Sequence, residues 1–92
     1  MERQRVHILI SGHVQGVGFR FAASHVAKRL AATGWVKNRH DGKVEIIAEG
    51  NRQQLAQLIE WAGQGPQYAT VDSVITDYSA ASNEFTDFLI IN

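Results

Sequence analysis

The spacing of hydrophobic residues changes along the first third of the chain. Val6, Ile8 and Ile10 occupy alternate positions, which is the spacing of a strand that buries one face. The spacing then becomes that of an amphipathic helix, with apolar residues at Phe19, Ala22, Ala23, Val26, Ala27, Leu30 and Ala31. We therefore predict a strand over residues 6–10, followed by a helix that begins at Phe19 and is closed by Gly34.

The next segment predicts a hairpin and a second helix. Two runs rich in strand-forming residues, 35–39 and 43–48, flank Asp41-Gly42, a pair that suits a turn with positive φ. Asn51 and Gln54 then hold the two positions of a capping box, which marks the start of a helix. Gly63-Gln64-Gly65-Pro66 ends this helix, and its apolar face carries Leu55, Leu58, Ile59 and Ala62.

The rest of the chain predicts strands over residues 71–78 and 85–91, with a turn over 79–84. The order of elements is that of an α+β, ferredoxin-like βαββαβ sandwich with a short extra C-terminal strand. Both helices must then cover one face of an antiparallel sheet, because a single core has to bury both apolar stripes. The other sheet face is expected to be more exposed, and the 35–39 strand is expected to lie at a sheet edge.

Composition and charge restrict the classes of function and of partner that the protein can have. The length of 92 residues fits a single domain, 1–92. Nine Lys and Arg residues balance nine Asp and Glu residues, so the zero net charge gives no general attraction for nucleic acid or an anionic membrane. The absence of cysteine excludes disulfides and thiol nucleophiles. We expect a cytoplasmic monomer that needs no cofactor or metal, with neither nucleic acid nor membrane as a partner; any anion must be bound locally.

A glycine-rich segment joins the first strand to the first helix: Gly12-His13-Val14-Gln15-Gly16-Val17-Gly18-Phe19-Arg20. Such a loop can curl so that its N–H groups converge on an anion, and it leads into a helix N-terminus that favours negative charge. Arg20, in the first helical turn, can place its guanidinium on two oxygens of one phosphate or carboxylate. The spacing fits neither the Walker pattern nor the dinucleotide fingerprint, and by itself it leaves a purely structural turn as the alternative.

Segment 14–20, VQGVGFR, resembles the signature of the acylphosphatases. The resemblance continues in a second block, which consists of Gly34-Trp35-Val36-Lys37-Asn38, Asp41-Gly42-Lys43-Val44-Glu45 and Glu49-Gly50. It extends over nearly the whole chain through Gly65-Pro66, Ala69, Val71, Phe85 and Phe88. The chain departs from the family at Ala31-Ala32, where relatives often have Gly-Leu, and at its Leu89-Ile90-Ile91-Asn92 ending, which lacks the basic and aromatic residues of some relatives.

The resemblance implies that the protein hydrolyses a small acyl phosphate to a carboxylate and inorganic phosphate. It further implies that Arg20 binds the phosphate, that Asn38 orients the attacking water, and that the phosphate is cradled by the backbone amides of Gln15, Gly16, Val17, Gly18 and Phe19. A carboxylate is a good leaving group and the phosphoryl transition state is loose, so positioning and charge stabilisation can suffice. An asparagine before a turn is also common for structural reasons alone, which leaves that alternative open for Asn38.

Three other functions fit parts of the sequence. An RNA-binding module of this fold would have aromatic residues on its central strands and a basic charge, which residues 6–10, residues 43–49 and the net charge do not supply. A non-catalytic anion-binding or regulatory domain could keep the loop, but the chain also has both Arg20 and Asn38. A similar domain begins a larger carbamoyl-transfer maturation protein; from the length and the strand-like ends of this chain we expect an independent protein.

Overall fold

The computed structural model describes residues 2–92, which form five strands and two helices in the predicted order. The first and fourth strands are longer than the hydrophobic alternation indicated, and the last one is shorter. The elements are β1 (Gln4–His13), α1 (Phe19–Arg29), β2 (Thr33–Asn38), β3 (Val44–Gly50), α2 (Arg52–Ala62), β4 (Thr70–Ala80) and β5 (Phe88–Ile91). Neither helix is long and apolar enough to cross a membrane.

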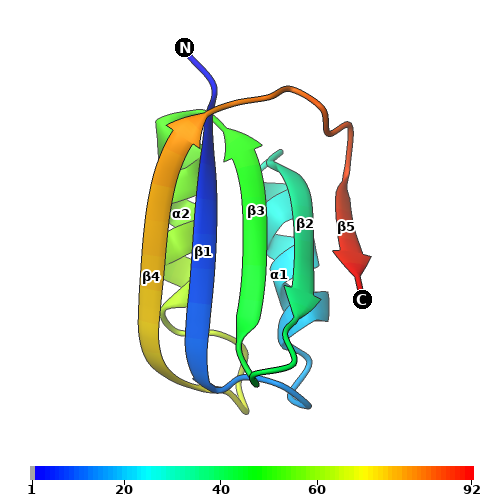
Figure 1. Ribbon diagram of the computed structural model, residues 1–92, viewed down its shortest axis with the longest axis vertical. Coiled ribbons are helices and arrows are strands. Elements are labelled where there is room, and N and C mark those ends of the chain that lie inside the picture. The colour runs from blue at the N-terminus through cyan, green and yellow to red at the C-terminus, as the bar shows by residue number, and fades with distance from the viewer. Residues whose placement is uncertain (1) are drawn as a thin grey trace.

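The five strands form one sheet in the order β4-β1-β3-β2-β5, and both helices cover the same face of it (Figure 1). All pairings among the first four strands are antiparallel, as predicted. The last strand differs, because β5 pairs in parallel with β2, from Gly34 opposite Phe88 to Lys37 opposite Ile91. The prediction that β2 lies at a sheet edge is therefore wrong: residues 81–87 carry the chain across one end of the sheet and bring β5 alongside β2 (Figure 1).

The end of α1 also differs from the prediction. The helix ends at Arg29, where the Ala32 N–H bonds to the Ala27 carbonyl at 2.9 Å and Ala31 between them has a left-handed φ of 62°. This is a Schellman arrangement, in which glycine usually takes the left-handed position. Gly34 lies five residues beyond Arg29, inside β2. It does not close the helix, because Ala31 takes the left-handed position despite its Cβ.

Two other local predictions are confirmed. The Asn51 side chain accepts a hydrogen bond from the Gln54 N–H at 2.9 Å, and the Gln54 side chain accepts one from the Asn51 N–H at 2.7 Å, so α2 begins with a capping box. Gly42, in the turn between β2 and β3, has φ of 91°. Local sequence chemistry therefore determines both the start of α2 and the hairpin that follows Asn38.

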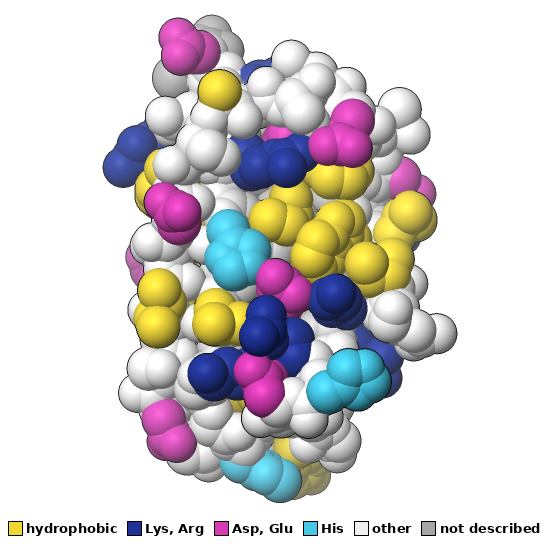
Figure 2. All heavy atoms as spheres, in the orientation of Figure 1, with side chains coloured by type: hydrophobic (Ala, Val, Ile, Leu, Met, Phe, Trp, Pro, Cys, Tyr) yellow, Lys and Arg dark blue, Asp and Glu magenta, His cyan; other side chains and the backbone are white. Residues whose placement is uncertain are grey.

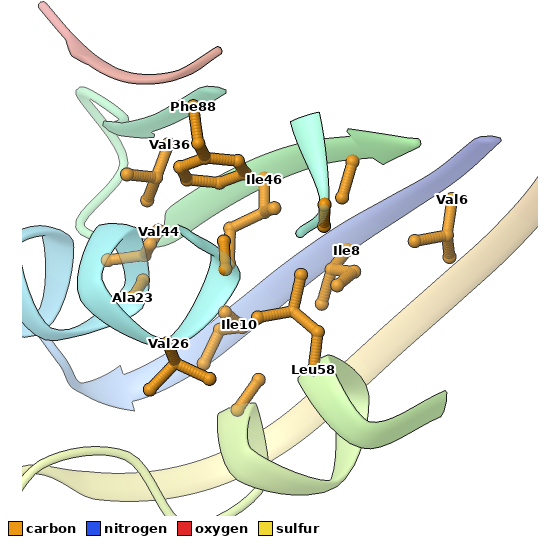
Figure 3. Packing of buried hydrophobic residues seen from close by; sticks show 14 of the residues in the cluster. Val6, Ile8, Ile10, Ala23, Val26, Val36, Val44, Ile46, Leu58 and Phe88 are labelled. Atoms are coloured by element: carbon orange, nitrogen blue, oxygen red, sulfur yellow. The ribbon is translucent and has the colours of Figure 1, made fainter. Parts of the chain in front are cut away.

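The core lies between the sheet and the two helices. Figure 3 shows Val6, Ile8 and Ile10 of β1 on the same side of the sheet as the helices, and all three are fully buried as the alternation predicted. Phe88 of β5 is buried in the same cluster, so the short last strand is anchored in the core. Complete burial of a side chain of this size contributes about 1.5–3 kcal/mol. The cluster extends close to the loop, because Val14 and Phe19 also belong to it.

The open face of the sheet, seen in Figure 2, mixes exposed hydrophobic residues with charged pairs. Glu45 lies among three basic side chains on this face. Its carboxylate is 2.7 Å from His7 Nε2, and 3.7 Å from both Lys37 Nζ and Arg39 Nη1. His7, Lys37 and Glu45 occupy positions of β1, β2 and β3 that alternate with the positions that build the core.

Candidate active site

The glycine-rich loop is fixed at both ends by buried side chains. Val14 enters the core before the loop and Phe19 after it, where the Phe19 ring lies 5.2 Å from the ring of Trp61 between centroids. Between them, Gly16 and Gly18 are exposed and have φ of 75° and 78°. A side chain at such a φ costs about 1–2 kcal/mol, so these two positions favour glycine. The core thus holds the ends of the loop while its glycines face solvent.

The N-terminus of α1 is left open by the protein. Its N-cap is Gly18, which has no side chain to accept from the first N–H groups, and the first turn contains no acidic residue. The other helix differs, since Asn51 and Gln54 close its N-terminus. The unpaired N–H groups and the helix dipole of α1 therefore favour an anion at this point.

A pocket of about 210 Å³ opens where this loop, the start of α1, the end of β2 and β5 come together. In Figure 1 the loop and the start of α1 lie at the lower end of the molecule, toward which β2 and β5 both point. The sequence separates the two predicted catalytic residues, but Arg20 of α1 and Asn38 of β2 both line this pocket. The full lining is Val14, Gly16, Gly18, Phe19, Arg20, Phe21, Asn38 and Ile90.

The carboxamide of Asn38 has an unusual environment. Its Oδ1 atom is buried and has no hydrogen-bond partner among residues 2–92. A buried acceptor without a donor costs about 1–3 kcal/mol, so such groups are rare unless water or a ligand satisfies them. Asn38 also lines the pocket, so its carboxamide lies close to any molecule bound there.

Gln15 connects the loop to the β2–β3 hairpin. Its side-chain Nε2 donates to the backbone carbonyls of Arg39 and Lys43, at 2.7 and 3.0 Å. Arg39 directly follows Asn38, and its own N–H donates to the Lys43 carbonyl at 2.8 Å. The Gln15 side chain therefore fixes the loop relative to the residue that faces the pocket from β2.

Charged groups beside the pocket stabilise the hairpin turn. Asp41 accepts hydrogen bonds from Arg39 Nε and from the Lys43 N–H, and these two contacts hold the pKa of the Asp41 carboxyl below its usual value of 3.8. Asp41 thus serves the turn, as its place before Gly42 indicated. Within residues 2–92, no three His, Cys, Asp or Glu side chains gather closely enough to hold a metal ion.

The structure brings together only part of the predicted cradle. Gly16, Gly18 and Phe19 line the pocket with Arg20, whereas Gln15 and Val17 do not. The role of the loop amides in binding phosphate remains a prediction.

Sequence reasoning missed three lining residues. Val14 and Phe21 adjoin the loop glycines and Arg20, so their position in the sequence could have indicated them. Ile90 carried no such signal, because its place depends on the parallel pairing of β5 with β2.

The comparison of sequences and the comparison of structures both find acylphosphatases among known proteins. Residues 6–90 match the acylphosphatase family. The acylphosphatase of Marinobacter nauticus is 49% identical over 88 residues, which is 96% of each chain. The crystal structure of acylphosphatase from Bacillus subtilis is similar with a TM-score of 0.94 and 35% identity, covering 97% of this chain and 99% of that one.

A larger protein also contains this fold. Full-length HypF, in a phosphate- and nucleotide-bound form, is similar with a TM-score of 0.90 and 28% identity; the match covers 99% of this chain but 12% of HypF. The two shorter relatives, in contrast, match along 96% and 99% of their own lengths. By these matches in sequence and structure, the chain belongs to the acylphosphatase family.

Proposed function

We propose that the chain performs the reaction of its family, hydrolysis of the carboxyl–phosphate bond of acyl phosphates, in the pocket between the glycine loop and the end of β2. The reaction follows from membership of the family, and the matches do not favour a non-catalytic regulatory domain. What we propose here is the role of each residue in this reaction. Arg20 and the loop amides from Gln15 to Phe19 hold the phosphate, and Asn38 orients the attacking water.

The observation that carries the proposal is that Asn38, whose buried Oδ1 has no hydrogen-bond partner among residues 2–92, lines the same pocket as Arg20. A water molecule there can donate one proton to Oδ1 and direct its lone pair into the pocket. The guanidinium and the open N-terminus of α1 supply positive charge to the same small space. An anion held by the loop and a water held by Asn38 would therefore lie next to each other.

The chemistry needs few further groups. The water oxygen attacks phosphorus, the bond between phosphorus and the carboxyl oxygen breaks, and the carboxylate leaves with the electron pair. The proton lost by the water passes to an oxygen of the substrate's own phosphate, so the products are a carboxylate and inorganic phosphate. Positioning and electrostatic stabilisation do most of the work in such transfers. One well-placed donor to the developing charge contributes about 10²–10³ in rate.

Replacing Asn38 with alanine tests the division of roles. We expect Asn38→Ala to lower kcat for benzoyl phosphate by about a hundredfold, because the water loses its acceptor. The inhibition constant of inorganic phosphate should stay within about threefold of the parent value, since the loop and Arg20 remain. The assay follows the ultraviolet change of benzoyl phosphate with a chelator present.

Inhibition by phosphate serves as the internal control in this experiment. If Asn38→Ala weakened phosphate binding as much as turnover, Asn38 would belong to the phosphate cradle. If turnover stayed near the parent value, Asn38 Oδ1 would have no part in catalysis. Circular dichroism of the variant checks that the β2–β3 hairpin and the fold are intact.

We also propose that residues 1–92 work as a single domain and as a cytoplasmic monomer. The two side chains to which we assign roles in the reaction, Arg20 and Asn38, line one pocket of a single chain, so the proposed mechanism uses no residue of a second copy. Sedimentation at the concentration used for the activity assay tests the monomeric state. Activity that appears only when the chain dimerises would contradict it.

A further inference from the structure

Two exposed hydrophobic side chains border the pocket. Phe21 of α1 is 76% exposed and Ile90 of β5 is 44% exposed, and both line the pocket with Arg20 and Asn38. They are 69 positions apart in the sequence, and the packing of β5 beside α1 and β2 brings them together. Each leaves apolar surface in water at the entrance to a site for a charged group.

The side chains of Ile90 and its neighbour Leu89 lie on opposite faces of β5. Side chains alternate between the two faces of a strand, and Phe88 enters the core on the helix side. Ile90 shares that side and reaches the pocket. Leu89, which is 55% exposed, points to the open face and does not line the pocket. The strand thus carries two exposed aliphatic side chains of the same size, of which one borders the site.

The ionisable side chains that line the pocket supply only positive charge. Arg20 is the single ionisable side chain among the described residues that line it. If Arg20 and the loop take the phosphate, no cation in the lining is left for a second anionic group on the substrate. The remaining wall, toward Phe21 and Ile90, is apolar and favours an uncharged group, because water-exposed apolar surface gains by being covered.

We propose that Phe21 and Ile90 form the binding site for the acyl part of the substrate and select uncharged, apolar acyl phosphates, aromatic or aliphatic, over those that carry a second carboxylate. The inference rests on the proposed function, since it takes the phosphate to lie in the loop. The acyl group then points out of the cradle between the two side chains. An aromatic acyl group can also pack against the Phe21 ring.

The test compares substrates in variants of both residues. In Phe21→Ser and Ile90→Ser, kcat/KM for benzoyl phosphate should fall about tenfold, the low end of what hydrophobic pockets contribute. For acetyl phosphate, which has a single methyl group beyond its carbonyl, kcat/KM should change less than about threefold. The loss should lie mainly in KM, because the apolar contact is the same in ground and transition states.

Leu89→Ser is the matched control, because it makes a similar aliphatic-to-polar change one residue away on the other face of β5. It should leave the benzoyl-to-acetyl ratio of kcat/KM unchanged. Phe21→Leu should restore most of the preference that Phe21→Ser loses. The inhibition constant of inorganic phosphate should be the same in all four variants, which separates a contact with the acyl group from damage to the cradle.

A matched pair of substrates tests the charge selection in the parent protein. Butanoyl phosphate and succinyl phosphate are similar in length and differ in a terminal methyl or carboxylate group. We expect the parent protein to prefer butanoyl phosphate by at least about tenfold in kcat/KM.

The outcomes distinguish failure of this inference from failure of the function. A parent that hydrolyses benzoyl and acetyl phosphate, but whose preference does not change in Phe21→Ser or Ile90→Ser, or which prefers succinyl phosphate, overturns the acyl site and leaves the function in place. A folded parent that hydrolyses none of these substrates overturns both. Equal losses on benzoyl and acetyl phosphate would show that the two side chains support the cradle instead.

Discussion

Glu49 near the end of β3 holds the connection between β4 and β5, and its loss should destabilise the protein strongly. Its side chain is fully buried although it faces the open side of the sheet, where Ser82 and Asn83 bond to it. Oε2 accepts from Arg5 Nε at 2.8 Å, from the Ser82 N–H at 2.8 Å and from Ser82 Oγ at 3.1 Å. Oε1 accepts from the Asn83 N–H at 2.9 Å.

The substitution Glu49→Gln changes this arrangement with almost no change in volume. In its better orientation the amide oxygen replaces Oε2, and the NH₂ group then meets the Asn83 N–H donor to donor. The variant loses one charge-assisted hydrogen bond, worth about 1.5–3 kcal/mol, and leaves the Arg5 charge without its anion at this point. We expect a total loss of about 3 kcal/mol in the free energy of unfolding, or roughly 15 °C in Tm for a domain of this size.

The effect should depend on pH. Burial alone would raise the pKa of Glu49, but hydrogen bonds from Ser82, Arg5 and Asn83 outweigh it and bring the pKa below its usual value of 4.5. The unfolded state therefore binds the proton more readily, and the stabilisation is complete above pH 4.5 and is lost as pH falls through the lower folded pKa. The difference between parent and Glu49→Gln should thus be largest near pH 7 and shrink in acid.

Urea unfolding at pH 7 and at several values below 4.5 measures both effects. Glu60→Gln is the matched control, since Glu60 is exposed on α2 and forms no ion pair within residues 2–92. It should change the free energy of unfolding by less than about 0.5 kcal/mol. The reasoning is refuted if Glu49→Gln is equally harmless, or if its cost is the same at pH 3 and pH 7.

Three further substitutions test other parts of the structure. Ala31→Gly should stabilise the protein by about 0.5–1 kcal/mol, because it relieves the left-handed φ of 62° at the end of α1; an unchanged or lower Tm would contradict the strain. Gln15→Ala should lower kcat at least about tenfold with a smaller effect on phosphate inhibition, since the loop loses its bonds to the hairpin beside Asn38; equal losses in both would reassign Gln15 to phosphate binding. Gly16→Val should weaken phosphate inhibition through its φ of 75° alone, because a Cβ there meets no atom within 4 Å; full phosphate affinity would show that the loop tolerates the change.

The elements that the sequence predicted well are those determined by local chemistry. The alternation of Val6, Ile8 and Ile10 gave the buried face of β1, and Asn51 with Gln54 gave the start of α2. Hydrophobic period and capping depend on neighbours a few residues away, so they can be read without the fold. The loop and Arg20 were also found from neighbouring residues in the sequence, and their role in phosphate binding stays a prediction.

The elements that were missed depend on contacts between distant segments. The parallel pairing of β5 with β2 requires the path of residues 81–87, and Glu49 and Arg5 bind this segment where it crosses the end of the sheet. Glu49-Gly50 belongs to the second block of the resemblance, but the neighbouring sequence does not show that this carboxylate is buried. Ile90 was missed for the same reason, since its position at the pocket follows from that pairing.

The candidate site contains residues that could be found from the sequence and contacts that could be found only from the fold. Arg20 and Asn38 were identified by resemblance to the acylphosphatases, but only the fold brings the end of β2 to the loop and the start of α1. The side chain of Gln15, expected only to contribute its backbone amide, bonds to the hairpin instead. A resemblance to a family identifies the residues of a motif. How these residues lie relative to one another is known only from the structure.

The most direct measurement is metal-independent hydrolysis of benzoyl phosphate by the parent protein and by Arg20→Gln, with Arg29→Gln as a control at the exposed end of the same helix. We expect the parent and Arg29→Gln to hydrolyse it equally with a chelator present. Arg20→Gln should lose at least about a hundredfold in kcat/KM and most of its inhibition by inorganic phosphate, because the cradle loses its positive charge. Near-parent activity in Arg20→Gln would contradict the assignment of phosphate binding to this loop.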